Sequence, residues 1–252
     1  MPWAFFFRRT YMNNNEKNNA NKHQIKTAIL IDGGFYRKRA KTLFGEKLPA
    51  ERAKELSEYC YRHLYDKHEQ RYLYRIFYYD CPPSDKNIFN PLKNANEHLK
   101  KSEEFSWMNA FLDELKHQRK FALRLGCLSE SQVAYHLSVS ATKDLLMGKR
   151  TIQQLTQKDL VLNIEQKGVD MRIGVDISSL AFKHQVNQII LISGDSDFVP
   201  AAKQARREGI DFILDPMHSV IKGDLFEHID GIRTPIQRKP PNQISAESSC
   251  DE

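Results

Sequence analysis

Two aspartates one residue apart follow an apolar run in ILISGDSDFVP, residues 190–200. If this run is a buried strand, Asp195 and Asp197 place two carboxylates at its carboxyl end. Asp32 follows a second apolar run in AILIDGG, and Asp170 opens a helical pattern that precedes the first run. An unpaired charge at the rim of a buried sheet is costly. If the two strands are neighbours, as in the usual doubly wound order, these acids from three separate segments can converge in one crevice.

The chemistry of such a cluster is that of a metal site. Carboxylates that crowd together repel each other and raise each other's pKa values, and a divalent cation removes that cost. Oxygen ligands without histidine or cysteine suit hard ions, so the cluster predicts magnesium or manganese (Mg²⁺ or Mn²⁺). Such an ion can activate a water molecule and stabilise the leaving oxygen of a phosphodiester.

Each acid also has a purely structural interpretation. Asp197 can cap the helix that follows it, and Asp170 can cap its own helix. Asp176 lies four residues after Arg172 and can pair with it on one helix face. The joint pattern is more specific than any single member.

The elements that must position these acids alternate along the chain. Apolar or aromatic runs predict strands at 28–31, 71–81, 121–128, 188–195 and 210–215. Helical spacing of apolar residues predicts helices at 48–64, 166–184, 198–209 and 218–229, and one that begins at Asn90-Pro91 and continues through Leu115. This alternation predicts an α/β fold with a parallel sheet between helices. Ligands bind such sheets at the carboxyl ends of the strands, where Asp32 and Asp195 fall.

The domain organisation follows from composition. Residues 1–24 are rich in Asn and predict a disordered N-terminal extension, with Met12 as a candidate initiator. Residues 25–233 form the expected domain, with an insertion near 129–165 that holds one or two helices. Residues 234–252, rich in Pro and Ser, predict a disordered tail.

Composition limits the class of protein. The chain has 252 residues, a formal charge of +6 and a pI of about 9.0, a balance that favours polyanionic partners such as nucleic acid. Its cysteines have no CxxC spacing, which indicates a reduced cytoplasmic protein without a disulfide framework or zinc module. No apolar run approaches the roughly 18 residues of a membrane span, and no signal peptide is evident.

Three motifs carry a resemblance to a known family. AILIDGGF, KGVDMRIGVDISSLA and ILISGDSDFVPAAKQARREGI occur in this order and together resemble the NYN domain, a branch of the PIN-like nuclease superfamily, and in particular its LabA-like bacterial members. The resemblance extends over about residues 26–233. It implies a three-layer α/β/α sandwich with a mainly parallel five-stranded sheet, and a metal-dependent nuclease that usually acts on RNA.

The resemblance also implies roles for single residues. The acids of the family map onto Asp32, Asp170, Asp195 and Asp197 as metal-binding and catalytic residues, whereas Asp176 matches a less clearly catalytic acid. The first motif departs from the family pattern D-G-x-N, because Phe35 stands where the asparagine is often found.

The expected partner is RNA, with structured or tRNA-like molecules among the candidates, and a homo-oligomer is compatible with the sequence. Basic residues near the motifs are candidates for phosphate contacts: Arg37, Lys38, Arg39, Lys167 and Arg172. Two alternatives remain open beside a ribonuclease. One is an RNA-binding module of the same fold without catalysis. The other is an aspartyl phosphatase, since residues 195–199 fit DxDx[TV], although only about 55 residues follow Asp197.

Overall fold

A six-stranded parallel sheet forms the centre of the protein. The computed structural model describes residues 24–67, 69–129, 133–164, 166–221 and 223–236. The strand order is β12-β11-β10-β1-β2-β5. The strands are β1 (Gln24–Asp32), β2 (Gln70–Asp80), β5 (Phe121–Leu125), β10 (Gln188–Ile192), β11 (Asp211–Asp215) and β12 (Gly231–Ile232). The prediction of five strands identified the first five and missed β12, because two residues are too short for a periodic pattern.

The middle of the sheet consists of the most apolar runs. β1 pairs in parallel with β10, with Leu30 opposite Leu191 and Ile31 opposite Ile192, and every residue of β10 is buried. Continuous apolar strands are typical of a parallel sheet that is covered on both faces. The strands of the first and third motifs are therefore neighbours, so that Asp32 and Asp195 follow adjacent strands.

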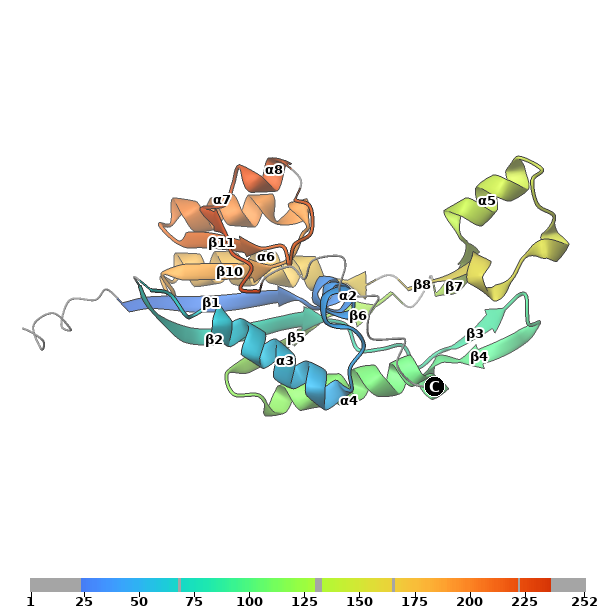
Figure 1. The fold of residues 1–252 in the computed structure, drawn as a ribbon, viewed down its shortest axis with the longest axis horizontal. Coiled ribbons are helices and arrows are strands. Elements are labelled where there is room, and N and C mark those ends of the chain that lie inside the picture. The colour runs from blue at the N-terminus through green and yellow to red at the C-terminus, as the bar shows by residue number, and fades with distance from the viewer. Residues whose placement is uncertain (1–23, 68, 130–132, 165, 222, 237–252) are drawn as a thin grey trace, which may run out of the picture.

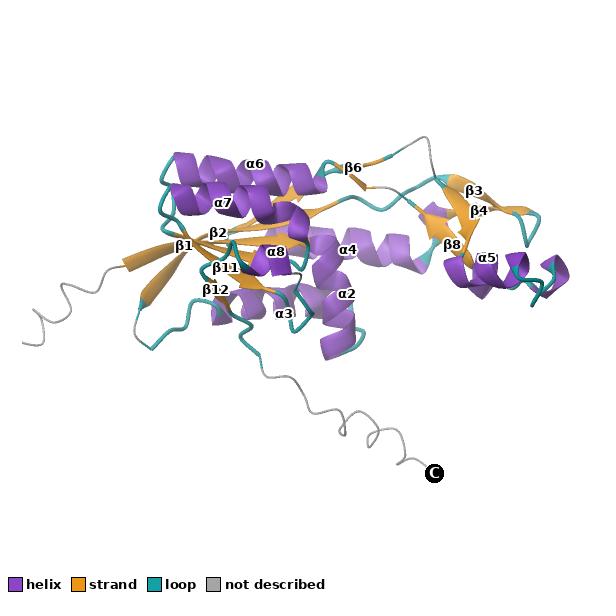
Figure 2. Ribbon diagram, turned by 90° about the horizontal axis from the view of Figure 1, so that it is seen from above, coloured by secondary structure: helices purple, strands orange, loops and turns teal. Residues whose placement is uncertain are grey.

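Helices cover both faces of the sheet, which confirms the three-layer α/β/α fold (Figures 1 and 2). Ile29 and Ile31 pack with α2 (Gly33–Phe44), α3 (Pro49–Arg62) and α4 (Glu103–His117). Ala28 and Leu30 point to the opposite face. The helices on that face are α6 (Val169–Phe182), α7 (Val199–Arg207) and the short α8 (Gly223–Phe226). The alternation along β1 is the period of two that a strand imposes on its side chains.

The start of α4 differs from the prediction. The helix begins at Glu103, and Ser102 caps it by accepting a hydrogen bond from the Phe105 backbone N–H at 3.1 Å. Asn90, expected to cap a helix that starts at Pro91, instead ends β3 (Asn87–Asn90), which forms a hairpin with β4 (Ala95–His98). The prediction was wrong because an asparagine side chain caps a turn as readily as a helix.

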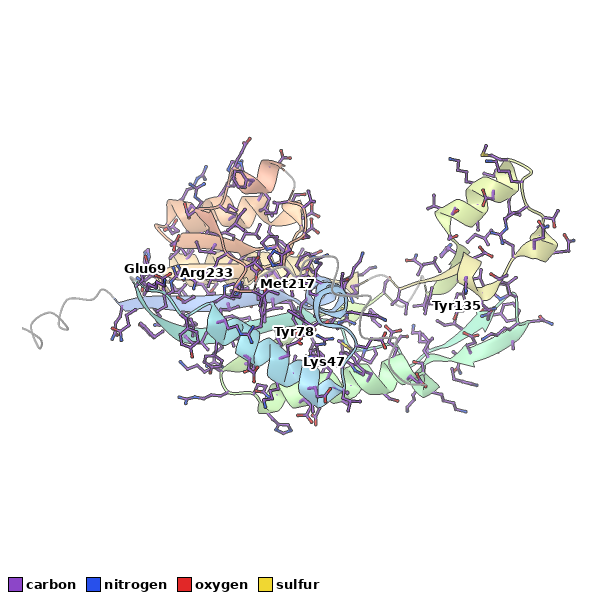
Figure 3. All side chains as sticks on the ribbon, in the orientation of Figure 1. Lys47, Glu69, Tyr78, Tyr135, Met217 and Arg233 are labelled. Atoms are coloured by element: carbon purple, nitrogen blue, oxygen red, sulfur yellow. The ribbon has the colours of Figure 1, made fainter. Side chains whose placement is uncertain are left out.

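A second body extends beyond the carboxyl ends of the sheet strands (Figures 1 and 2). It joins the β3–β4 hairpin to β7 (Ala134–Leu137), α5 (Val139–Leu146) and β8 (Leu160–Asn163), and is called the arm below. Asn90, which is buried, donates to Glu97 Oε1 and to Gln157 Oε1, both at 2.9 Å. The Tyr135 hydroxyl, labelled in Figure 3, donates to Glu97 Oε2 at 2.5 Å. These contacts unite two segments that are distant in sequence.

The described part of the chain contains no helix that is both long and apolar enough to cross a membrane. The predicted disordered ends lie outside the described residues, except for residue 24 and residues 234–236. Gln24 begins β1, and the Thr234 hydroxyl donates to Asp215 Oδ1 at 2.7 Å.

Candidate active site

Asp32 lies at the carboxyl end of β1 and joins two elements. Its Oδ1 accepts a hydrogen bond from the Phe35 backbone N–H at 3.0 Å and so caps α2, while its Oδ2 accepts one from the Ser193 hydroxyl at 3.2 Å. Burial raises the pKa of Asp32, and the charges of Asp170 and Asp80 raise it further against these hydrogen bonds. Asp32 is thus rigidly oriented and close to other carboxylates.

The end of β10 presents Asp195 and Asp197. The Asp195 backbone N–H donates to Ser193 Oγ at 3.2 Å, and Asp195 Oδ1 accepts from the Asp197 backbone N–H at 3.1 Å, which caps the short 3₁₀ turn at residues 196–198. The following helix, α7, has Phe198 as its N-cap and no side-chain cap. Asp197 therefore does not cap this helix, and its structural interpretation is wrong.

Asp170 lies in the first turn of α6. The N-cap of this helix is Gly168, whose φ of 79° is readily adopted by glycine, and no side chain caps it. Burial raises the pKa of Asp170, followed by the charges of Asp195 and Asp197. Among the described residues, neither the Asp170 nor the Asp197 carboxylate accepts a hydrogen bond or forms an ion pair. Both carboxylates are therefore available to an external ligand.

Asp80 is a further strand-end acid that the sequence analysis missed. It is fully buried at the end of β2, where Arg37 donates to Oδ2 from Nε at 3.0 Å and to Oδ1 from Nη2 at 3.1 Å. The Tyr78 hydroxyl and the Cys81 backbone N–H also donate to it, at 2.9 and 2.8 Å. A Cβ on Gly33 would lie 2.4 Å from Asp80 Oδ2, so only glycine permits this approach. The run FYYD, which ends on an acid as AILID does, was the available signal.

Asp176 has internal partners instead of lying open to a ligand. The Arg124 Nε donates to Asp176 Oδ2 at 3.0 Å and the Tyr79 hydroxyl donates to the same oxygen at 2.8 Å. Arg172 instead donates from Nη1 to Gly168 O at 3.1 Å. The predicted Arg172–Asp176 pair is wrong, because Asp176 faces β2 and β5, which supply better-placed donors.

The basic residues of the site fall into two groups. Lys38, Lys167 and Arg172 are exposed. Arg39 donates from Nε and Nη2 to Met217 O at 3.1 and 2.7 Å, and Arg37 is engaged with Asp80. The exposed group has side chains that can reach a ligand, whereas the second group holds elements of the fold together.

The donor set can be tested against a divalent cation. Within the described residues, no three His, Cys, Asp or Glu side chains are gathered closely enough to hold a metal ion. Mg²⁺ usually binds through one or two carboxylates, with waters and substrate phosphates as its other ligands. Burial raises the pKa values of Asp32 and Asp170, and neighbouring carboxylates raise them further, so a bound cation would favour the charged form of both. The residues therefore fit an ion that has few direct protein ligands.

Similarity to known proteins identifies the family of the chain. The model of the NYN domain family matches residues 26–220. No curated protein matches the chain. Among solved structures, the chain is similar to "a protein of unknown function VPA0982 from Vibrio parahaemolyticus RIMD 2210633", with 12% sequence identity and a TM-score of 0.43 over 84% of this chain and 93% of that chain. Because the family model spans most of its length, the protein belongs to the NYN domain family, within the PIN-like nuclease superfamily.

Proposed function

We propose that this protein is a metal-dependent ribonuclease that hydrolyses RNA phosphodiester bonds at the carboxyl edge of its sheet. The observation that carries the proposal is the electrostatic coupling of acids from three segments. Burial raises the pKa of Asp170, and the charges of Asp195 and Asp197 raise it further; burial also raises the pKa of Asp32, with a smaller contribution from the charge of Asp170. Perturbed carboxylates that converge at the ligand-binding edge of an α/β sheet are a typical feature of a catalytic site.

Each residue then has a role. One or two of the Asp170, Asp195 and Asp197 carboxylates would bind Mg²⁺ or Mn²⁺ directly, and the others, with Asp32, would bind it through waters. When bound, the ion neutralises phosphate oxygens and lowers the pKa of a water. Asp32, fixed by Phe35 and by Ser193, can accept a proton because its pKa is raised.

The coupling predicts a stabilising effect of metal that depends on pH. Carboxylates with a raised folded-state pKa, such as Asp32 and Asp170, disfavour folding fully above that pKa, and the penalty is lost as the pH falls below the ordinary value of 3.8. A ligand that binds only the folded protein at about a hundred times its Kd raises the free energy of unfolding by about 2.7 kcal/mol, and we expect this gain for Mn²⁺ at pH 7. Thermal melts between pH 7 and pH 4 should show this gain shrinking as protons compete for the carboxylates.

The control is a carboxylate of the same type outside the site. Asp113 is exposed on α4 and pairs with Lys116 at 3.2 Å. Asp113→Asn should retain the full metal-induced shift, whereas Asp170→Asn should lose most of it. A shift that is equal in both variants would show that the ion binds elsewhere.

The exposed basic residues predict the path of the RNA backbone. Replacing Lys38, Lys167 and Arg172 with Ala should weaken binding of all single-stranded RNAs alike and reduce the log–log salt slope by about 2, at roughly 0.7 per phosphate contact. Affinities would be measured over a salt series in Ca²⁺, which is used here to support binding without turnover.

The control is a triple variant that loses the same number of positive charges away from the site. Lys54, Lys183 and Lys203 are exposed on α3, after α6 and on α7. Their triple Ala variant should keep the slope of the unmodified protein. Equal slopes in the two triple variants would place the RNA elsewhere on the surface.

An RNA-binding module without catalysis is the second candidate, because no three described acids are gathered into a ready metal site. Incubation of the protein with total RNA and Mn²⁺, followed by end mapping, separates the two. Hydrolysis by water should yield discrete ends without 2′,3′-cyclic phosphates, and EDTA should abolish it. Binding without new ends would support the module, and release of phosphate from a phosphomonoester would support the phosphatase.

A further inference from the structure

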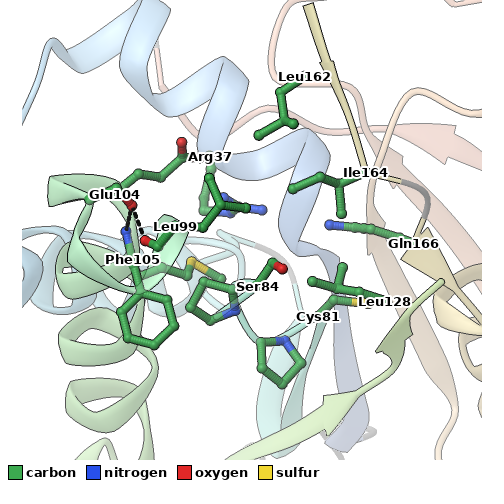
Figure 4. Close-up of a pocket in the computed structure, with 14 residues that line it drawn as sticks. Arg37, Cys81, Ser84, Leu99, Glu104, Phe105, Leu128, Leu162, Ile164 and Gln166 are labelled. Carbon is green, nitrogen blue, oxygen red and sulfur yellow. Dashed lines mark hydrogen bonds between the residues drawn. The ribbon is translucent and has the colours of Figure 1, made fainter. Parts of the chain in front are cut away.

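A pocket of about 290 Å³ lies where the sheet edge meets the base of the arm (Figure 4). Its walls combine a guanidinium, an amide, a thiol and apolar side chains, contributed by Arg37, Gln166, Cys81, Phe105, Leu128 and Ile164. Figure 4 shows Arg37 and Gln166 extending into the same space from different elements. Its volume is near the lower end of the range for small-molecule sites, about 300 Å³, which suits a single ring system.

Short segments of the chain connect the pocket to the acidic site. α2, which Asp32 caps, carries Arg37 into the wall. Asp80 is followed directly by Cys81, and Gln166 belongs to β9 (Gln166–Lys167), which leads into the helix of Asp170. β9 pairs with β6 (Cys127–Leu128), and this pair holds Leu128 beside Gln166. Only short segments of chain therefore separate the residues of the pocket from three of the strand-end and helix-start acids, Asp32, Asp80 and Asp170.

We propose that this pocket holds one unpaired nucleobase of the RNA, near the phosphate that a cation at the acidic site would bind. That the base belongs to RNA rests on the proposed ribonuclease function. The test below measures nucleotide binding and does not require cleavage of RNA. Single-stranded RNA is recognised by stacking of unstacked bases on aromatic rings or guanidinium planes and by hydrogen bonds to base edges. Two hydrogen bonds to Asp80 fix the plane of the Arg37 guanidinium, so it can stack without further loss of side-chain freedom.

The other walls complete this chemistry. The Gln166 amide offers both a donor and an acceptor, as a base edge requires. Leu128, Ile164 and the half-buried Phe105 supply apolar surface for the ring. Glu104 also lines the pocket, and its negative charge disfavours a phosphate as the occupant.

The probes are the four nucleoside 5′-monophosphates and ribose 5-phosphate, which lacks a base, all titrated in EDTA. Nucleotides should shift the methyl NMR signals of Leu128, Leu162 and Ile164 and show saturation transfer to their base protons, whereas ribose 5-phosphate should do neither.

Gln166→Ala should weaken nucleotide binding about tenfold. Ile164→Trp, which fills the pocket, should abolish it, and its methyl spectrum reports whether it is folded.

The matched control is Gln70→Ala, since Gln70 is exposed at the opposite end of β2 from Asp80 and should leave binding unchanged. Equal responses to nucleotides and ribose 5-phosphate, or equal affinities in Gln166→Ala and Gln70→Ala, would overturn the proposal. Nucleotide binding in a protein that cleaves no RNA would support the pocket while refuting the ribonuclease. RNA cleavage without nucleotide-dependent shifts would refute the pocket alone.

Discussion

Asp195→Asn is expected to lower RNA cleavage by at least about a hundredfold, the range found when one group that stabilises a transition state is removed. The substitution removes a charge from the proposed metal site but keeps the shape of the side chain. Asparagine Oδ1 can still accept the hydrogen bond from the Asp197 backbone N–H, so the 3₁₀ turn should persist. Cleavage of a labelled single-stranded RNA in Mn²⁺ measures the effect.

The stability of Asp195→Asn without metal is a second measurement on the same variant. Because the Asp195 charge raises the pKa of Asp170, its removal should lower that pKa toward the ordinary value and leave metal-free stability level or higher. Asp113→Asn, on the exposed surface of α4, should change neither cleavage nor stability measurably. Full activity in Asp195→Asn would remove this residue from the catalytic site.

Arg37→Ala is expected to lower the free energy of unfolding by about 3 kcal/mol, since it leaves a buried charge without its partner. Asp80 is fully buried, and the Tyr78 hydroxyl and the Cys81 backbone N–H would be its remaining donors. These two donors place the expected loss at the lower end of the range for a broken buried ion pair. Urea unfolding followed by far-UV circular dichroism measures it.

A double-mutant cycle separates loss of the ion pair from loss of packing. Asp80→Asn in the Arg37→Ala background should restore much of the stability, because it removes the uncompensated charge. Arg124→Ala is the matched control, since its ion pair with Asp176 is more exposed and should contribute no more than about 1 kcal/mol. If Arg37→Ala costs no more than Arg124→Ala, Arg37 is not the structural partner of Asp80 and is free for RNA.

Much of the fold could be predicted from periodicity. The apolar runs that became β1, β10 and β11 and the helical spacing of α3, α6 and α7 are local properties of the chain. The same pattern placed Asp32 and Asp195 at the carboxyl ends of strands, which lie at one edge of a parallel sheet, whereas the pairing of β1 with β10 is a result of the tertiary structure. The predictions failed where one local signal fits two structures, as with the turn at Asn90 and the short strand β12.

Only part of the candidate site could be predicted from the sequence. The acids Asp32, Asp170, Asp195 and Asp197 could be proposed because each begins or ends a recognisable element. Their separation from the structural acids required partners that lie far away in the chain. Arg124, which engages Asp176, is 52 residues distant from it, and no spacing rule predicts that contact.

The sequence by itself determined the order of strands and helices and the edge at which the acids meet, since both follow from side-chain periodicity and parallel connection. Tertiary structure alone decided how each charge is used. Arg37 meets Asp80 across 43 residues, which converts an expected phosphate ligand into a buried counter-charge. Asn90 meets Gln157 across 67 residues, which joins two insertions into one arm. Both contacts join segments that are distant in sequence, and no local sequence pattern predicts them. The free energy of burying and pairing a charge depends on its neighbours in space, which only the tertiary structure supplies.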